Sequence, residues 1–169
     1  MMKIKTLLIT CFALVALVSC KSDDSGDDTS GGSSSVGTYT LVSITSAENL
    51  DPNADGTFDD TELINNINCN SALVLNSDDT FVWQEIVLSQ PLDSSGYGGI
   101  TCIVDVHEGD YTVNDGSLVL NITNITNGRT DILSISQNEV EFSTTRRLVI
   151  SVGGVPTSRQ VALVFKYSK

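Results

Sequence analysis

The stretch that decides the fold is GDYTVNDGSLVL, residues 109–120. Tyr111 and Val113 alternate with polar residues before the Asn-Asp-Gly turn at 114–116, and leucines alternate in the same way after it. A period of two places the apolar side chains on one face of each strand, and the turn residues tolerate the positive φ of a tight hairpin. The stretch therefore predicts two antiparallel strands joined by a short turn.

The same period of two continues outward in both directions from this hairpin. The first strand of the hairpin is predicted to begin at Ile103 and to include Val104 and Val106. Further strands are predicted around Leu41–Ile44, Ala72–Leu75, Phe81–Leu88, Leu133–Ile135, Val140–Phe142, Leu148–Val152 and Val161–Tyr167. About eight to ten short strands joined by turns predict an all-β antiparallel meander. Within one domain, such a meander hides its edges by closing into a barrel or folding into a sandwich, and we expect the barrel.

Two segments depart from the strand pattern. Pro91–Gly99 is rich in Pro, Ser and Gly, so we expect it to form a loop at one rim. Leu63, Ile64 and Ile67 have the spacing of a helical stripe, which predicts one short helix over residues 61–68.

The N-terminus has the pattern of an export signal. Lys3 and Lys5 precede an apolar run over residues 7–18, which is too short to span a hydrocarbon core of about 30 Å and is typical of a signal peptide. The run ends in Leu17-Val-Ser-Cys20, which resembles the lipobox of bacterial lipoproteins. The resemblance implies a lipoprotein signal peptide over 1–19, with lipid on the Cys20 thiol and an acyl chain such as palmitate on its amino group. The alternative is an ordinary cleaved signal peptide with a chance cysteine.

Residues 20–35 form a polar segment that precedes the domain predicted over 36–169. After the cysteine this segment is built from Ser, Gly, Asp, Thr and one Lys, which predicts a flexible acidic tether. Its acidic cluster over 23–28 resembles the export tags of surface lipoproteins, so we expect an outer-membrane protein displayed at the cell surface. The alternative is the periplasmic face of the outer membrane.

Four cysteines reduce to two once Cys11 leaves with the signal peptide and Cys20 carries lipid. Cys69 and Cys102 then predict a disulfide, because disulfides persist outside the cytoplasm. A redox dithiol is the weaker alternative, since neither residue lies in a Cys-x-x-Cys pair or beside a cation. The net charge of −12 argues against a sequence-independent nucleic-acid binder, and the single histidine argues against a multi-histidine metal centre.

Residues 51–62, DPNADGTFDDTE, resemble EF-hand and dockerin-type calcium loops over twelve residues. Oxygen ligands stand at the diagnostic positions, with the turn glycine at Gly56 and the predicted ligands at Asp51, Asn53, Asp55, Thr57, Asp59 and Glu62. Because a strand rather than a helix precedes the loop, we expect a structural calcium site and not a sensor. The alternative is a solvated acidic turn with Asp60 or Thr61 as a helix N-cap.

Three stretches resemble the lipocalin-like domain of Gram-negative envelope lipoproteins. They are GTYTLVSI at 37–44, ALVLNSDDTF at 72–81 and the 109–120 hairpin. Tyr39 stands where that family has tryptophan, and Asp79 where it has a turn glycine. The resemblance implies a lipocalin-like barrel and does not imply a ligand.

No nucleophile–base–acid set stands out, so we expect no enzyme. His107 is a lone histidine on a strand, and nothing in the sequence places it beside the acids Glu85, Asp105 or Glu108. We expect a lipid-anchored envelope module that binds a small apolar ligand or a glycan, with Phe81, Trp83 and Tyr111 as candidate lining residues. Filling of the core is the competing role for these three. The alternative function is a structural or accessory surface lipoprotein that acts through protein contacts without a pocket.

Overall fold

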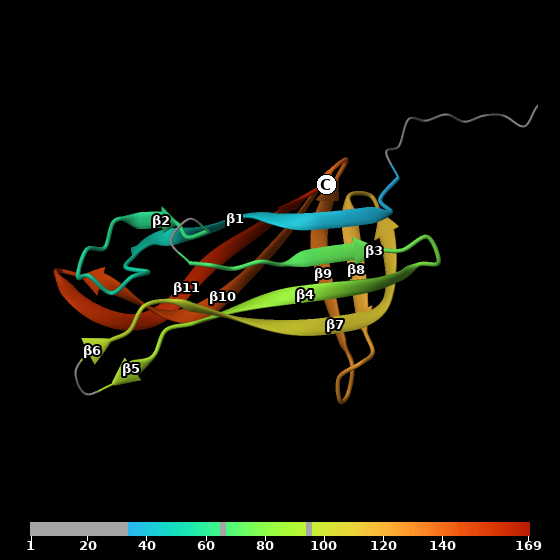
Figure 1. The fold of residues 1–169 in the computed structure, drawn as a ribbon. Coiled ribbons are helices and arrows are strands. Elements are labelled where there is room, and N and C mark those ends of the chain that lie inside the picture. The colour runs from blue at the N-terminus through green and yellow to red at the C-terminus, as the bar shows by residue number, and fades with distance from the viewer. Residues whose placement is uncertain (1–33, 65–66, 94–95) are drawn as a thin grey trace, which may run out of the picture. The chain divides into compact units, whose positions relative to one another are not determined.

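A computed structural model describes residues 34–64, 67–93 and 96–169. Within these residues the chain is all-β and contains no helix (Figure 1). The strands are β1 (Gly37–Leu50), β2 (Asp60–Glu62), β3 (Ala72–Leu75), β4 (Thr80–Ser89), β5 (Leu92–Asp93), β6 (Gly96–Tyr97), β7 (Thr101–Asn114), β8 (Ser117–Ile122), β9 (Arg129–Ser136), β10 (Glu139–Val152) and β11 (Val155–Ser168).

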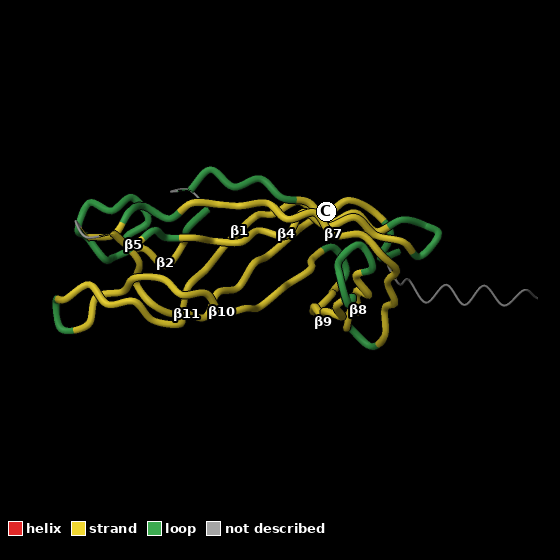
Figure 2. The backbone as a smooth tube through the Cα atoms, turned by 90° about the horizontal axis from the view of Figure 1, so that it is seen from below, coloured by secondary structure: helices red, strands yellow, loops and turns green. Residues whose placement is uncertain are grey.

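Eight of these strands form a closed antiparallel barrel, which confirms the barrel prediction. The order is β11-β10-β9-β8-β7-β4-β3-β1, and β1 pairs with β11 to complete the circle. Thr40 of β1 lies opposite Ser168 of β11 in this closing pair. β8 and β9 are short, whereas β10 and β11 continue as a long hairpin beyond them, alongside β1, β4 and β7 (Figure 2).

The hairpin predicted over 109–120 is formed by β7 and β8. Asn114 pairs with Ser117 across a two-residue turn in which Asp115 has φ 46° and Gly116 has φ 78°. Two consecutive positive φ values define the type I′ geometry that matches the twist of antiparallel strands. The Asn127-Gly128 turn before β9 has the same pair of signs.

Large aromatic side chains fill the centre of the barrel. Trp83, Tyr39, Tyr167, Phe81 and Phe165 are the largest of the fully buried side chains. They arise from β1, β4 and β11, because each of these strands directs alternate residues inward. The interior is therefore a packed core, as in other small barrels.

The core continues beyond the short strands and is fixed there by the predicted disulfide. Cys69 and Cys102 are bonded, with their Cα atoms 5.9 Å apart. The bond joins the segment before β3 to the start of β7, beside the buried side chains of Leu50, Leu63 and Ile100.

The predicted helix over 61–68 is not confirmed. Thr61 and Glu62 lie in β2 instead, where Glu62 pairs with Thr45 of β1. One helical-type hydrogen bond follows, from the Ile67 N–H to the Leu63 carbonyl at 3.0 Å, and residues 65 and 66 lie outside the described part. The expected loop over 91–99 is also partly wrong, because β5 and β6 form a small hairpin within it.

Candidate functional site

The three candidate ligand-lining residues are buried and packed against other side chains. Trp83 is fully buried, its indole N–H donates to the Tyr167 hydroxyl at 3.2 Å, and the Phe142 ring meets it edge-on with centroids 5.1 Å apart. Phe81 is 1 % exposed, and the Tyr111 hydroxyl donates to the Asn76 carbonyl at 2.9 Å. All three therefore serve the core.

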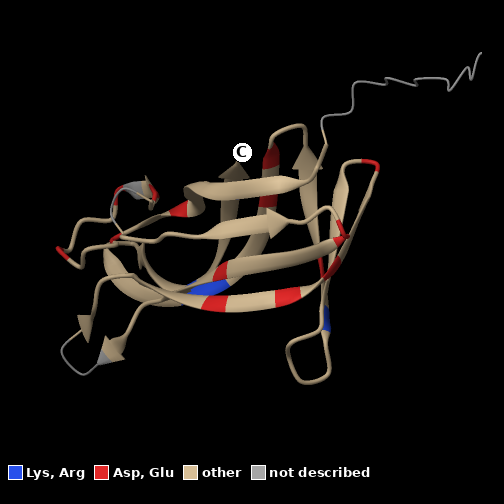
Figure 3. Cartoon of the chain, turned by 45° about the vertical axis from the view of Figure 1, so that its right-hand side comes forward, with Lys and Arg blue, Asp and Glu red and all other residues tan. Residues whose placement is uncertain are grey.

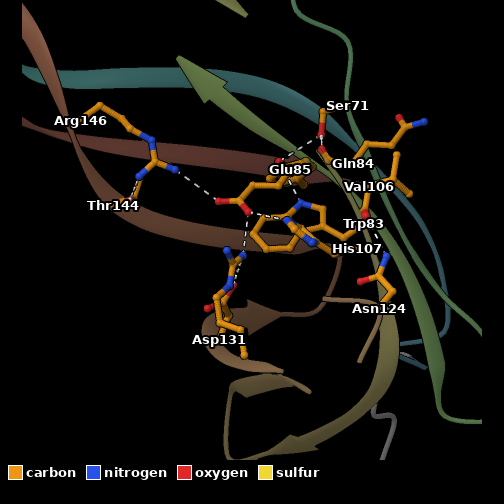
Figure 4. A network of polar contacts seen from close by, with 12 residues as sticks. Ser71, Trp83, Gln84, Glu85, Val106, His107, Asn124, Asp131, Thr144 and Arg146 are labelled. Atoms are coloured by element: carbon orange, nitrogen blue, oxygen red, sulfur yellow. Dashed lines mark hydrogen bonds and ion pairs between the residues drawn. The ribbon is translucent and has the colours of Figure 1, made fainter. Parts of the chain in front are cut away.

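The main polar cluster inside the barrel forms around Glu85 (Figure 4). Trp83 and Glu85 of β4 lie opposite His107 and Asp105 of β7 in the strand register, so all four share one face of the sheet. The Glu85 side chain is only 4 % exposed, and its Oε2 lies 2.8 Å from His107 Nε2. A buried carboxylate needs paired charges and hydrogen bonds to offset its desolvation.

Two arginines from the other side of the barrel supply that compensation. Arg129 of β9 donates to Glu85 Oε2 at 2.7 Å and to Asp131 at 2.6 Å. Arg146 of β10 lies 3.4 Å from Glu85 Oε1 and also donates to the Thr144 hydroxyl at 3.0 Å. Although burial acts to lower it, hydrogen bonds to the two carboxylates hold the pKa of Arg129 above its usual value. The cluster thus ties β4 and β7 to β9 and β10.

This arrangement brings together one of the pairs that the sequence left separate. His107 and Glu85 are in contact, but Asp105 is exposed beside them and Glu108, one residue from His107 along β7, points to the opposite face. His107 Nδ1 is buried and has no partner among the described groups. With Glu85 occupied by two arginines, the cluster contains a histidine–carboxylate pair but no hydroxyl or thiol nucleophile bonded to the histidine.

The acidic loop folds around a buried aspartate. Asp51 is fully buried, and its carboxylate accepts the N–H groups of Asp55 at 3.1 Å and Gly56 at 2.7 Å. The Tyr97 hydroxyl of β6 donates to the same carboxylate at 2.7 Å, and the Tyr97 ring packs on Phe58 with centroids 5.6 Å apart. Burial, followed by the hydrogen bond to Asp51, raises the pKa of Tyr97 to about 12. Gly56 has φ 92°, as the sharp turn of such a loop requires.

Hydrogen bonds within the loop link the other predicted calcium ligands, and Asn53 Oδ1 shares the Asp55 N–H with Asp51 Oδ1. Asp55 accepts the Thr57 N–H at 2.8 Å and the Asn53 amide at 3.0 Å, and the Thr57 bond is the main cause of its lowered pKa. Asp59 is exposed, and Glu62 accepts the Ile44 N–H at 3.3 Å from its place in β2. Within the described ranges, no group of three or more His, Cys, Asp or Glu side chains is placed to hold a metal. The loop thus has the predicted turn, with Asp51 and Asn53 both directed at the Asp55 N–H, and calcium binding there stays a prediction.

Sequence reasoning missed Arg129, Arg146 and Tyr97. Each acts at long range: Arg129 meets a residue 44 positions away, Arg146 one 61 positions away, and Tyr97 one 46 positions away. The sequence contained one indication of the arginines. An acid on the inner face of a strand, as at Glu85, needs a cationic partner from elsewhere in the chain.

Comparisons with protein-family models, with curated proteins and with solved structures find no match for this chain. No helix in the described part is both long and apolar enough to span a bilayer. The predicted signal peptide, the lipidation site Cys20 and residues 20–33 of the tether lie outside the described residues, whereas Ser34 and Ser35 at the end of the tether are described.

Proposed function

We propose that this protein is a lipid-anchored lipoprotein of the bacterial outer membrane, displayed at the cell surface, that acts through contacts made by the outside of its barrel. The observation that carries the proposal is the filled interior. Trp83 and Phe81, which an interior ligand would have to displace, are themselves core residues.

The sequence supports the anchor and the location. The lipobox-like Leu17-Val-Ser-Cys20 provides the thiol for the lipid, and the polar segment up to residue 35 provides the spacer. Several acyl chains bury enough CH₂ groups for stable anchoring, which a single chain does not. Metabolic labelling with palmitate tests this part: we expect label on the wild type and on Cys11→Ser, and none on Cys20→Ser. Label that persists on Cys20→Ser contradicts it.

The contact function is tested by native mass spectrometry of the full-length protein, extracted from membranes in mild detergent, together with cross-linking on intact cells. We expect the mass of the lipidated chain without a small molecule, and a discrete cross-linked protein adduct. A small molecule bound in a one-to-one ratio would overturn the proposal and restore the interior ligand as the first hypothesis. Absence of any protein adduct also counts against it.

A second candidate function is glycan binding at a hollow on the outer surface of the barrel instead of in its interior. A hollow of about 620 Å³ is lined by Asp79, Asp110, Tyr111 and Asn114, among others. Carboxylates and amides of this kind hydrogen-bond sugar hydroxyls. Binding on a glycan array that is lost in Asp110→Ala and kept in Glu141→Ala, which alters an exposed acid of β10, would favour this function, and absence of binding would remove it.

Calcium binding to residues 51–62 is proposed as an accessory feature, on the spacing of its oxygen donors. Glu62, the predicted closing ligand, accepts the Ile44 N–H through Oε1 at 3.3 Å.

A further inference from the structure

One segment of the barrel wall has an open edge. β4 pairs with β7 along the whole of Thr101–Asp110, whereas β8 pairs with β7 only from Gly109 onward. β7 is therefore an edge strand over residues 101–108, with no strand on its second side within the described part of the chain, and it forms the lower edge of this region in Figure 1.

The backbone groups on that edge can be identified by their alternation. The Glu108 carbonyl accepts the Thr123 N–H, and the Val106 carbonyl accepts the Asn124 side-chain amide, each at 2.9 Å. In an antiparallel strand, every second residue directs both its N–H and its carbonyl to the same side. Val104 therefore directs its N–H and its carbonyl to the open edge, and Val106 directs its N–H there. Among the described residues, no strand pairs with these groups.

The side chains on this edge are apolar and exposed. Ile103 is 52 % exposed, Val104 45 % and Val106 51 %. Edges of native sheets are usually protected by Lys, Pro, bulges or a covering segment. Residues 101–108 contain neither Lys nor Pro, and their register with β4 has no bulge. Thr123 and Asn124 cover the carbonyls of Glu108 and Val106, so the backbone groups of Val104 and the Val106 N–H are the part of this edge that can serve as a template for strand addition.

The charged residues near this edge indicate which kind of chain could pair with it. Asp105 lies directly opposite Glu85 in the register, and it forms no ion pair among the described groups, whereas Glu85 is already neutralised by arginines. Opposite charges across a strand pair are favourable, so a cation at the facing position of an added strand would stabilise the exposed carboxylate of Asp105. A second copy of this chain would bring no cation to the edge, because β7 contains no Lys or Arg and the chain carries a net charge of −12. Red positions, Asp and Glu, also outnumber the blue Lys and Arg positions along the cartoon in Figure 3.

We propose that the open edge of β7 binds an extended segment of a partner protein as an added strand, and that this segment places a Lys or Arg beside Asp105 between apolar residues that cover Val104 and Val106. This inference rests on the proposed function, since it names the surface and the kind of partner through which a filled barrel would act.

The test uses full-length protein in detergent micelles and a blocked, fluorescently labelled peptide of alternating valine and lysine as the probe. We expect saturable binding by fluorescence anisotropy and slowed amide exchange at Val104 and Val106. A peptide N-methylated on its pairing edge should bind about tenfold more weakly, because it loses at least one net hydrogen bond of about 1.4 kcal/mol. A peptide of alternating valine and glutamate should also bind more weakly.

Matched variants separate backbone pairing from charge attraction. Val104→Pro removes the edge N–H and should weaken binding about tenfold, while Ile132→Ser, which alters an exposed apolar residue on β9, should not. If Val104→Pro fails to fold, Asp105→Lys decides, since it should reverse the preference toward the glutamate peptide. Peptide binding that is unaffected by N-methylation and by Asp105→Lys overturns the proposed strand addition. Dimerisation of the protein through the same edge also overturns it, because the added strand would then come from a second copy of this chain. If the peptides do not bind but native extraction still finds a protein partner and no small molecule, this inference fails while the proposed function stands.

Discussion

Replacement of Trp83 by alanine measures how tightly the barrel interior is packed. The indole is fully buried, contacts the Phe142 ring edge-on and donates to the Tyr167 hydroxyl. Truncation of a large buried aromatic residue costs about 3–5 kcal/mol when the core cannot collapse around the cavity. Loss of the buried hydrogen bond adds about 1 kcal/mol. We therefore expect Trp83→Ala to lower the free energy of unfolding by about 4–6 kcal/mol.

The assay is urea denaturation followed by circular dichroism, on the full chain with Cys20→Ser so that no lipid is attached. Trp83→Phe is the conservative variant and should cost about 1–2 kcal/mol, since it keeps most of the ring volume. Ile132→Ala is the surface control, since Ile132 is 70 % exposed, and it should cost less than about 1 kcal/mol. A loss of less than about 2 kcal/mol for Trp83→Ala would contradict a filled interior, because it would mean that the indole borders empty or solvent-filled space.

Four further changes test other parts of the account. Glu85→Gln should cost about 3 kcal/mol by thermal or urea unfolding, because it leaves the partly buried arginines without their carboxylate, and an unchanged stability would contradict the cross-barrel tie. Replacement of Cys69 and Cys102 by alanine should cost about 3–4 kcal/mol, since the bond closes a loop with a sequence separation of 33, and equal melting temperatures for the double variant and the wild type would exclude a structural role. The raised pKa of Tyr97 means that the folded state holds this proton more tightly, so stability should fall as pH rises from about 10 to 12 in the wild type, and a Tyr97→Phe variant that shows the same fall would refute this. Added Ca²⁺ should raise the melting temperature of the wild type more than that of Glu62→Gln if the loop binds calcium, and equal shifts would remove the assignment.

The local features of the fold could be predicted because they depend on neighbouring residues. Alternation at Leu118, Leu120 and Ile122 places these residues in the core of β8, where they are buried. The Asn-Asp-Gly turn fixes the β7–β8 hairpin by its tolerance of positive φ. Barrel closure could also be predicted, because a meander of this length has edges to hide.

The acidic loop shows which contacts of a carboxylate the spacing does not predict. The sequence places Asp51 at the first ligand position, but nearby N–H groups and the distant Tyr97 hydroxyl satisfy this carboxylate in the folded chain. Glu62 follows β2 into the sheet, because pairing with Thr45 of β1 satisfies its backbone. Spacing predicts which oxygens are available, whereas the tertiary fold decides which of them already have donors.

The Glu85 cluster and the open edge of β7 could not be predicted, because both depend on register between strands that are far apart in sequence. The contact between Glu85 and His107 follows from the pairing of Trp83 with His107, which the length of the β4–β7 connection sets. The open edge follows from the short length of β8, since β7 continues beyond its partner. Alternation alone identifies the inner face of each strand and leaves these alignments undetermined.

The filled interior is tested most directly by titration of the wild-type protein with xenon, monitored by NMR of the leucine methyl groups. Xenon enters apolar cavities that are large enough to hold it. We expect no saturable shifts at Leu73, Leu120 and Leu163 in the wild type, and clear shifts in Trp83→Ala, which serves as the positive control. Saturable shifts of these methyl groups in the wild type would contradict a filled barrel and point back to an interior ligand.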